Sequence, residues 1–470
     1  MPTDVTVDAP CGPVVGRRDG AMLRFGGVPY ARAERWGAPE PCSWTEPFDA
    51  TRPGGAPPQT VGGLDLVPDM VPSRQDEACL TAEVCTHDIG GSDPVLVWVP
   101  GGSYRIGAAS LATYDGAHLA ARGVVVVGLN YRLGALGWLA ADGVPSNLGL
   151  RDLRAAIDWL RANVAAFGGD PDRIVLMGES AGSGAIAHLL ASDRVPVAGA
   201  ILQSGAPAGT LDADAAAWVA QTFLDAAGAS SVDALRDEPV GALLAAQEQT
   251  VEAALAKVGM MPFHPWVDDD LLRHPAHQAE LPPIPLVVGT TAHEMELFRD
   301  QVPVLPDDIA VMYLAGKAAG LGITDEACVR AGFDACGGDL VEAVADLELH
   351  LPNELLVRAH RARGNPVYRY RFNWEAPVRR ACHALDLPFT FGTLDVSTWR
   401  EFAGATGDDR ADALAARMQE AWTTFAADGV PRDETIGPWP EGELVGLGVD
   451  APVGDDAVSA RLRVWLGEPS

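Results

Sequence analysis

Ser180 stands in the segment Gly178-Glu-Ser-Ala-Gly182, with an apolar run before it and a run rich in Ala and Leu after it. This order predicts a buried strand, a sharp turn and a helix, an arrangement that presents a serine as a nucleophile. A Cβ at Gly178 or Gly182 would collide with the crossing strand or helix, which explains a glycine at both positions. The N-terminus of the helix favours the negative charge that develops during attack on a carbonyl group.

A serine hydroxyl needs a histidine to take its proton and a carboxylate to orient that histidine. Two later segments follow apolar runs and supply candidates, Glu294 and His383. The chain order serine, acid, histidine is typical of one large fold class of hydrolases. The acidic run Asp268 to Asp270 (Asp268, Asp269 and Asp270) competes with Glu294, although a solvated turn explains it more simply. The three residue types together predict acyl transfer through a covalent intermediate.

The elements that must position these residues alternate between apolar runs and helical patterns. Strands are expected at 93–100, 123–130, 174–178, 198–205, 283–289 and 367–372, and helices at 147–167 and 411–427. Such alternation predicts an α/β fold with a mostly parallel sheet and crossover helices. No internal repeat or charged linker divides the chain. We therefore expect one domain over 1–470, with helical insertions around 210–260 and 307–363.

The composition excludes several classes of partner. The chain has 34 Lys and Arg against 64 Asp and Glu, a net charge of −30, which disfavours nucleic acid and anionic membrane surfaces as partners. No apolar run is long enough to span a membrane, and the first residues lack the basic and apolar parts of a signal peptide. We therefore expect no membrane association. No feature of the sequence indicates an oligomeric state.

The cysteines and histidines favour a protein without a metal. The seven cysteines form no Cys-x-x-Cys pair, and their number is odd, so free thiols in a reducing, cytoplasmic environment are expected. The pair His274 and His277 has no accompanying ligands at zinc spacing. The prediction is that the protein uses no metal and no cofactor.

Eight short segments are similar to those of the type-B carboxylesterases, the group that includes bacterial para-nitrobenzyl esterases and cholinesterases. Together they cover most of the chain: Gly27-Val-Pro-Tyr30, Asp76-Glu-Ala-Cys-Leu80, Asn130-Tyr-Arg-Leu133, Asn147-Leu-Gly-Leu-Arg-Asp152, Phe167-Gly-Gly-Asp-Pro171, Gly178-Glu-Ser-Ala-Gly182, Gln203-Ser-Gly205 and His383-Ala-Leu-Asp-Leu-Pro-Phe389. This resemblance implies the α/β-hydrolase fold, a central twisted sheet flanked by helices.

The resemblance also implies roles for single residues. Ser180 would be the nucleophile, His383 the general base and acid, and Glu294 the triad acid. Two further positions near the triad match Glu179 and Ser204. Backbone N–H groups of an oxyanion hole would come from Gly102, Ser103 and Ala181.

Two departures from the family pattern are visible. The family usually has His-Gly-Gly-Gly-Phe where this chain has Pro100-Gly-Gly-Ser-Tyr104. The Cβ of Ser103 restricts a conformation that glycine adopts freely, and Pro100 has no N–H. Secreted relatives pair the cysteine at the Cys79 position with an upstream cysteine, which this chain lacks. Cys79 is therefore expected to be a free thiol.

The resemblance and the three residue types predict a serine hydrolase of small, fairly apolar carboxylic esters. Two alternatives stay open at this point. The same residues could cleave a carbamate or an amide, because acyl transfer uses the same groups. A binding protein of the same fold with weakened catalysis is also compatible with the changed oxyanion segment. Among residues that contact the substrate, Tyr104 and Phe389 are the ones the sequence suggests.

Overall fold

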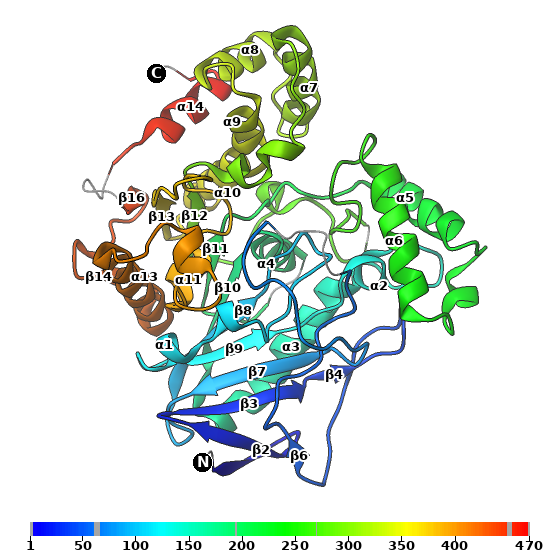
Figure 1. Ribbon diagram of the computed structural model, residues 1–470, viewed down its shortest axis with the longest axis vertical. Helices are drawn as coiled ribbons and strands as arrows, with labels where there is room; N and C mark the ends of the chain where they lie inside the picture. The colour runs from blue at the N-terminus through cyan, green and yellow to red at the C-terminus, as the bar shows by residue number, and fades with distance from the viewer. Residues whose placement is uncertain (1–2, 61–65, 193–194, 269, 449–453, 469–470) are drawn as a thin grey trace.

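The computed structural model describes residues 3–60, 66–192, 195–268, 270–448 and 454–468. Within these residues a twelve-stranded mixed sheet runs through the molecule, with the strand order β1-β2-β3-β7-β9-β8-β10-β11-β12-β13-β16 and β6 paired with β2 (Figure 1). The pairs from β9 through to β16 are parallel, and the pairs from β1 through to β9 on the path are antiparallel. The predicted parallel sheet is therefore confirmed for the half from β9 to β16.

The strands have the following bounds: β1 Asp4–Ala9, β2 Gly12–Asp19, β3 Met22–Pro29, β4 Ala31–Arg32, β5 Glu40–Pro41, β6 Phe48–Asp49, β7 Thr81–Thr86, β8 Asp93–Val99, β9 Val125–Leu129, β10 Gly169–Glu179, β11 Gly199–Gln203, β12 Leu286–Thr291, β13 Val367–Phe372, β14 Arg432–Asp433, β15 Gly437–Pro438 and β16 Leu444–Leu447. β4 pairs with β5 and β14 with β15 in two separate small sheets.

The helices have the following bounds: α1 Ala117–Ala120, α2 Gly134–Trp138, α3 Leu148–Asn163, α4 Ala181–Ser192, α5 Ala213–Ala226, α6 Val240–Ala254, α7 Asp307–Ala319, α8 Glu326–Ala335, α9 Leu340–Ala345, α10 Leu351–Ala362, α11 Leu387–Phe391, α12 Trp399–Phe402, α13 Asp409–Asp428 and α14 Ala457–Trp465. Among the described residues, no helix combines the length and the apolar sequence that crossing a bilayer requires.

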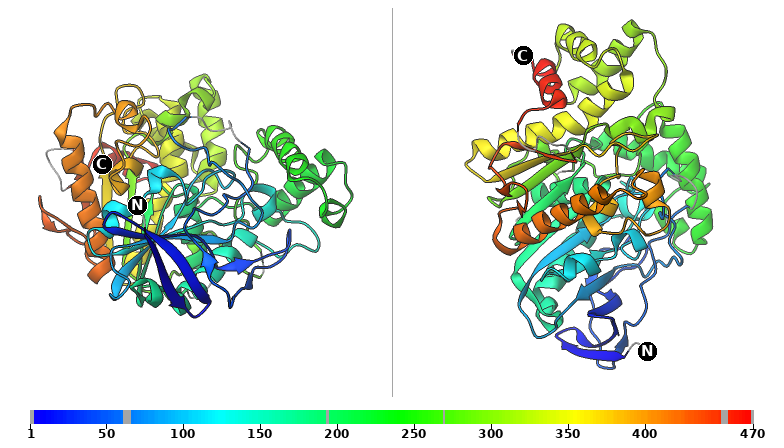
Figure 2. Two further views of the ribbon diagram at one scale, coloured as in Figure 1. Left: turned by 60° about the horizontal axis from the view of Figure 1, so that its bottom comes forward. Right: turned by 60° about the vertical axis from the view of Figure 1, so that its left-hand side comes forward.

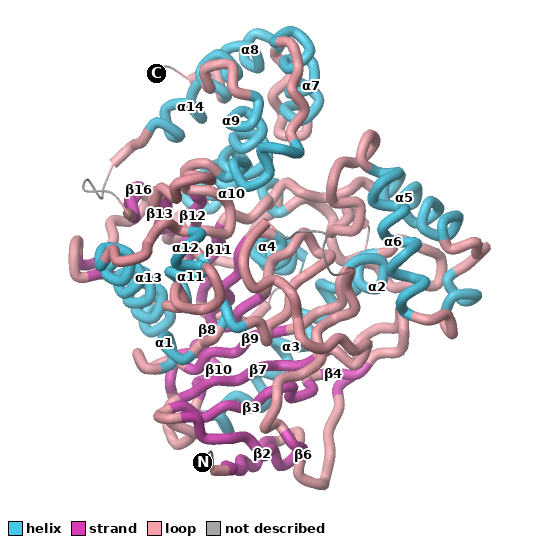
Figure 3. The backbone as a smooth tube through the Cα atoms, in the orientation of Figure 1, coloured by secondary structure: helices cyan, strands magenta, loops and turns pink. Residues whose placement is uncertain are grey.

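Helices cover both faces of the sheet, because the central strands are apolar on both sides. In β8, Val95 and Val97 point to the face that α3 and α4 cover, whereas Leu96 and Trp98 point to the face of α11 and α13. Neighbouring side chains of a strand alternate between faces, so one apolar run fills two layers of core. Figures 2 and 3 show the strands inside and the helices around them.

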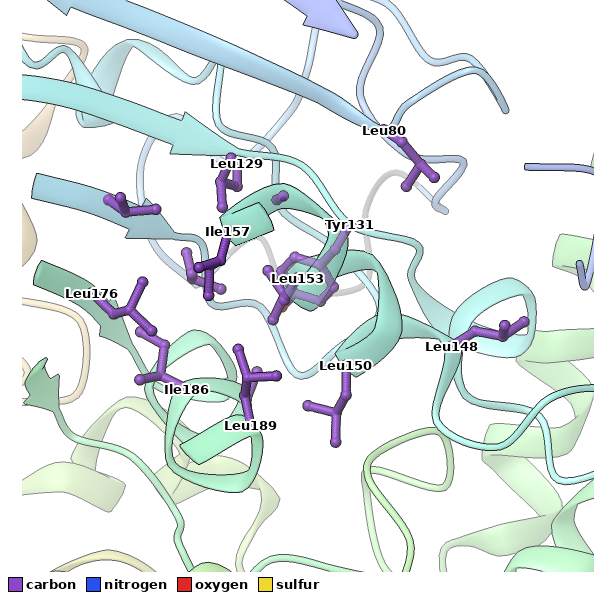
Figure 4. Close-up of a cluster of buried hydrophobic side chains, with 14 of the residues drawn as sticks. Leu80, Leu129, Tyr131, Leu148, Leu150, Leu153, Ile157, Leu176, Ile186 and Leu189 are labelled. Atoms are coloured by element: carbon purple, nitrogen blue, oxygen red, sulfur yellow. The ribbon is translucent and has the colours of Figure 1, made fainter. Parts of the chain in front are cut away.

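Figure 4 shows the core between the sheet and the first of these layers. Leu153 and Ile157 of α3 pack beside Ile186 of α4 and Leu176 of β10. All four side chains are buried. The spacing of Leu153 and Ile157, one turn apart on α3, is the helical pattern that the sequence contains. This packing fixes α4, and with it the turn that carries Ser180.

Both predicted insertions contain helices. α5 and α6 lie in the range 210–260 and form a lobe at one side of the molecule (Figure 1). α7, α8, α9 and α10 lie in the range 307–363, where α7 to α9 share an apolar cluster with the terminal helix α14. That the whole chain forms one domain stays a prediction.

All seven cysteines lie in the described residues and are free, as predicted for Cys79. Cys79 is buried, and burial raises the pKa of its thiol well above the ordinary value. A thiol with a raised pKa carries little thiolate at neutral pH, so Cys79 is a packing residue.

A buried ion pair joins two of the segments quoted above for the family resemblance. Arg132, after β9, donates to both carboxylate oxygens of Asp152 on α3, at 2.8 Å from Nε and 2.6 Å from Nη2, and Nη1 donates to the carbonyl oxygen of Gly37. The Asp152 side chain is fully buried. The pair therefore fixes the loop after β9 to α3 and to the N-terminal region.

We predict that Arg132→Leu lowers the free energy of unfolding by about 3–5 kcal/mol, because Asp152 is left buried without its partner. Urea unfolding followed by tryptophan fluorescence measures this change. As a matched control, Arg463→Met removes the exposed pair with Asp455 and should cost less than about 1 kcal/mol. Equal effects of the two substitutions would contradict the role of the buried pair.

Candidate active site

Ser180 lies in the predicted sharp turn, between the end of β10 and the start of α4. Its φ is +55°, in the left-handed region, and its backbone N–H donates to the carbonyl oxygen of Gln203 at 2.9 Å. A Cβ added to Gly182 would lie 2.0 Å from the carbonyl oxygen of Val99, and one added to Gly178 would lie 2.8 Å from Gly182. The predicted steric need for both glycines is confirmed.

Glu294 and His383 meet beside the same edge of the sheet, each on a loop that follows a parallel strand. His383 Nδ1 lies 2.6 Å from Glu294 Oε2, and Thr291 N–H donates to Oε1 at 2.8 Å. The backbone N–H of His383 also donates to the carbonyl oxygen of Glu294. Both side chains are buried. This contact places the Nδ1 proton toward the carboxylate and leaves Nε2 for another partner.

The competing acidic run lies elsewhere. Asp268 accepts from the side-chain amide of Asn147 and from backbone N–H groups of the turn that follows, including Asp270 and Leu272. Asp270 is exposed and pairs with Arg151. Asp269 lies outside the described residues. Of the two acidic segments, the one with Glu294 is therefore in contact with His383.

The second nitrogen of the imidazole faces another carboxylate. His383 Nε2 lies 3.2 Å from Oε1 of Glu179, the residue just before Ser180. Ser180 and His383 line one cavity, but within the described residues no hydrogen bond joins the serine hydroxyl to the imidazole. Catalytic hydrogen bonds often tighten only when substrate binds. The structure thus contains the histidine–carboxylate contact and has the serine nearby with its hydroxyl uncommitted.

The three backbone N–H groups that the family resemblance implies for an oxyanion hole are without an acceptor in the described part of the protein. Within the described residues, the amides of Gly102, Ser103 and Ala181 donate no hydrogen bond to other protein groups. Ser103 and Ala181 line the cavity together with Ser180. The backbone N–H groups of Arg105 and Ile106 both donate to the carbonyl oxygen of Gly102 and close a turn. This turn leaves the amides of the loop free.

The departure from the family sequence places Ser103, which has a Cβ, at a position with a positive φ. Gly102 has φ +116°, and Ser103 has φ +54°, a region that favours glycine. Ser103 adopts it nonetheless, so its N–H stays available. The carbonyl oxygen of Pro100 accepts from the hydroxyl of Tyr131 at 2.9 Å, which anchors the start of the loop without a histidine.

The cavity in front of Ser180 has a volume of about 450 Å³. Its walls are mostly apolar and come from segments far apart in the sequence: Val251, Leu255, Met260, Met261, Met295, Phe298 and Leu349. Tyr104 lines the cavity, as predicted. Phe389 does not, and that prediction was wrong: its ring packs in the core against Phe372 and Trp374.

Comparison with known proteins now identifies the family. A sequence model described as the carboxylesterase family matches residues 3–309 and 331–444. The chain is 35% identical to the para-nitrobenzyl esterase of Bacillus subtilis (strain 168), over 91% of each chain. The chain belongs to the carboxylesterase family. It is therefore an enzyme that hydrolyses carboxylic esters.

Further similarities agree with this assignment. The phenmedipham hydrolase of Pseudarthrobacter oxydans is 33% identical, over 91% of each chain. A solved structure titled thermophilic PNB esterase superposes with a TM-score of 0.87 at 32% identity, and the alignment covers 98% of this chain and 100% of that one. The α/β-hydrolase fold expected for a carboxylesterase is thereby confirmed.

Burial and charge shift the pKa values of the carboxylesterase site. Burial raises the pKa of Glu179 to about 8. For His383, burial acts to lower the pKa, but the carboxylates of Glu179 and Glu294 outweigh it and raise the pKa to about 9. Because Glu179 and His383 are in contact, the charge of each affects the pKa of the other.

The sequence reasoning assigned no role to a polar group that lies behind the imidazole. Asp386 Oδ2 accepts from Gln203 Nε2 at 3.2 Å and from the hydroxyl of Tyr370 at 3.3 Å. Burial raises the pKa of Asp386 to about 6. Asp386 lies in the same family segment as His383. Its place in that segment was the signal from which the sequence could have identified it.

Ser204 lies at the cavity wall, as expected for a position near the triad. Its backbone N–H donates to the carbonyl oxygen of Gly289, and its hydroxyl has no partner among the described residues. Within the same residues, no group of three or more His, Cys, Asp or Glu is arranged to hold a metal ion.

We predict that kcat/KM rises with pH as His383 loses its proton, with an apparent pKa above the ordinary value of a histidine. Glu179→Gln removes a negative charge that stabilises the imidazolium, so the rising limb should move to lower pH by about one unit or more. Initial rates from pH 5 to 10 measure the shift. The distant surface substitution Glu468→Gln should leave the limb in place, and an upward or absent shift in Glu179→Gln would contradict the assignment.

We also predict opposite effects for two substitutions of Ser103. Ser103→Gly keeps the N–H and suits φ +54°, so kcat/KM should stay within about threefold of the original. Ser103→Pro removes the donor and cannot adopt a positive φ, so kcat/KM should fall by about a hundredfold or more. Ester hydrolysis assays and circular dichroism of both variants measure this. Full activity of a folded Ser103→Pro would exclude this amide from the oxyanion hole.

Proposed function

We propose that this carboxylesterase hydrolyses small, fairly apolar carboxylic esters through an acyl-enzyme, with Ser180, His383 and Glu294 as its catalytic triad. The observation that carries the proposal is the buried contact of 2.6 Å between Glu294 and His383, next to a cavity that Ser180 also lines. A carboxylate on one imidazole nitrogen makes the other nitrogen the proton acceptor that a serine nucleophile requires.

The first half of the reaction forms the covalent intermediate. The hydroxyl oxygen of Ser180 attacks the ester carbonyl carbon while Nε2 of His383 takes the hydroxyl proton. The carbonyl oxygen becomes an oxyanion, which the amides of Gly102, Ser103 and Ala181 stabilise by hydrogen bonds. The bond to the alcohol oxygen then breaks, and His383 gives its proton to the departing alcohol.

The second half of the reaction returns the free enzyme. A water molecule takes the place of the alcohol and gives a proton to Nε2 of His383 as it attacks the acyl carbon. The same three amides stabilise the second oxyanion. The bond to Ser180 breaks, the serine oxygen takes the proton back, and the carboxylic acid leaves.

His383 can act as a base only in its neutral form. The pKa of about 9 describes the imidazole with Glu179 beside it. A substrate that displaces Nε2 from Glu179 toward Ser180 removes that stabilisation of the charged form. Glu179 would therefore hold the imidazole in the resting enzyme, and Glu294, in contact with Nδ1, would stabilise the imidazolium that forms during attack.

The chemistry of the cavity supports the substrate class. Its walls are dominated by methionine, leucine and phenylalanine side chains, and methionine adapts to ligands of different shape. A volume of about 450 Å³ fits a ligand of modest size. Hydrolysis of a carbamate or amide by the same residues stays an alternative. A cytoplasmic location and the absence of nucleic-acid partners stay predictions.

We predict that Ser180→Ala lowers kcat for a para-nitrophenyl ester by at least about 10⁴-fold, because no other group can form the acyl-enzyme. The matched control is Ser192→Ala at the other end of α4, where the hydroxyl only donates to the carbonyl oxygen of Leu189. Its kcat should stay within about twofold. Turnover by Ser180→Ala at the original rate would exclude the proposed mechanism.

A further inference from the structure

Two polar side chains, Tyr104 and His264, lie side by side in the wall of the cavity. Their rings stack with centroids 6.3 Å apart and an interplanar angle of 28°. Both residues are at least nine-tenths buried, with exposed fractions of 4% for Tyr104 and 7% for His264. Tyr104 directly follows Ser103 of the oxyanion loop, whereas His264 comes from the segment between α6 and β12.

His264 presents a hydrogen-bond acceptor. Its Nδ1 contacts the carbonyl oxygen of Met261, so Nδ1 carries the proton and donates it there. Burial lowers the pKa of His264 to about 4, which keeps the ring neutral at physiological pH. Nε2 then has a free lone pair, and within the described residues it contacts no donor.

Tyr104 presents a hydroxyl that is also without a partner. Among the described residues, no group forms a hydrogen bond with its Oη. The hydroxyl lies against the first turn of α4: a Cβ added to Gly184 would be 2.6 Å from Oη, and Gly184 N–H donates to the carbonyl oxygen of Ser180. Oη is therefore close to the turn that carries the nucleophile.

We propose that Tyr104 and His264 recognise a polar group of the ester substrate that offers one hydrogen-bond donor and one acceptor, as a secondary amide does. The amide N–H would donate to Nε2 of His264, and the hydroxyl of Tyr104 would donate to the amide carbonyl oxygen. This inference rests on the proposed function, because it assigns part of the substrate of the same site.

The energetics favour such a substrate. A buried polar group without a partner is unfavourable, and a ligand that supplies the missing partner recovers that free energy. Met260, Met295 and Phe298 of the cavity wall supply apolar contact and no hydrogen bonds. The preferred ester would then have apolar parts together with one amide-like group near the reacting carbonyl.

The test compares esters that differ only in this group. In the first pair, one ester has a secondary amide in its acyl chain and the other has two methylene groups at the same place. In the second pair, the two esters differ in the same way in the alcohol chain. Dissociation constants are measured by calorimetry in the Ser180→Ala background, so the result does not depend on turnover. Failure of the proposed function would show in the turnover assays, independently of these constants.

In at least one pair, Tyr104→Phe and His264→Leu should each weaken binding of the amide ester about three- to tenfold relative to its methylene partner. The matched control is Tyr368→Phe, which removes a tyrosine hydroxyl from β13 on the face of the sheet with Phe425, away from the cavity. The ratio of dissociation constants for the amide and the methylene ester should be the same in this variant as in the parent.

The two pairs of esters also decide against the inference if it is wrong. The inference would be overturned if the ratio of dissociation constants for the amide and the methylene ester stayed within twofold of the parent value in both variants and for both pairs. A loss of binding that is equal for the amide and the methylene ester would overturn it too, because it would reveal a role in shaping the cavity. Circular dichroism spectra establish that each variant is folded.

Discussion

An imidazole held between two buried carboxylates is the interaction on which the site depends. Glu294 and Glu179 approach opposite nitrogens of His383, at 2.6 Å and 3.2 Å, in a region where all three side chains are buried. Taking charges out of water is costly unless they are paired, so the surrounding structure must hold this arrangement firmly. The parallel strands β10, β12 and β13 do so by ending at one edge of the sheet.

The steric demands of the turn at Ser180 set the rest of the arrangement. The missing side chain of Gly182 allows α4 to pass against the end of β8, where the oxyanion loop begins. The proposed nucleophile and the proposed donors for the oxyanion are thereby brought together by one close contact. Positive φ angles at Ser103 and Ser180 are the backbone strain that this geometry requires.

Much of this could be predicted from sequence, because the signals are local. The strand expected at 367–372 coincides with β13, and the helix expected at 411–427 lies within α13. β7 was not predicted: its half-buried Glu83 accepts from the N–H groups of Gly27 and Gly54, and it breaks the apolar pattern of a central strand.

Features that depend on contacts between residues far apart in the chain were not predicted from the sequence. The approach of Glu179 to His383 joins positions about two hundred residues apart, and it takes the place of the expected hydrogen bond from Ser180. The ring of Phe389 is in a segment with the right motif, yet it faces the core. His264 gave no signal either, since its neighbour Tyr104 comes from another part of the chain.

The cavity brings the proposed acyl-transfer groups together with walls from other parts of the chain. The acyl-transfer groups come from the sheet edge and the turn before α4, whereas the walls come from the segments around α6, β12 and α9. Substrate choice can therefore differ between carboxylesterases without disturbance of the triad.

The central claim is that an ester's acyl group is transferred to Ser180. Rapid acid quenching during turnover, followed by mass spectrometry of the peptides, tests this most directly. We expect the mass of the acyl group on the peptide that contains Ser180, and its disappearance once substrate is exhausted. An enzyme that turns over with no acylated peptide at any quench time, or with the acyl group on another residue, would contradict the account.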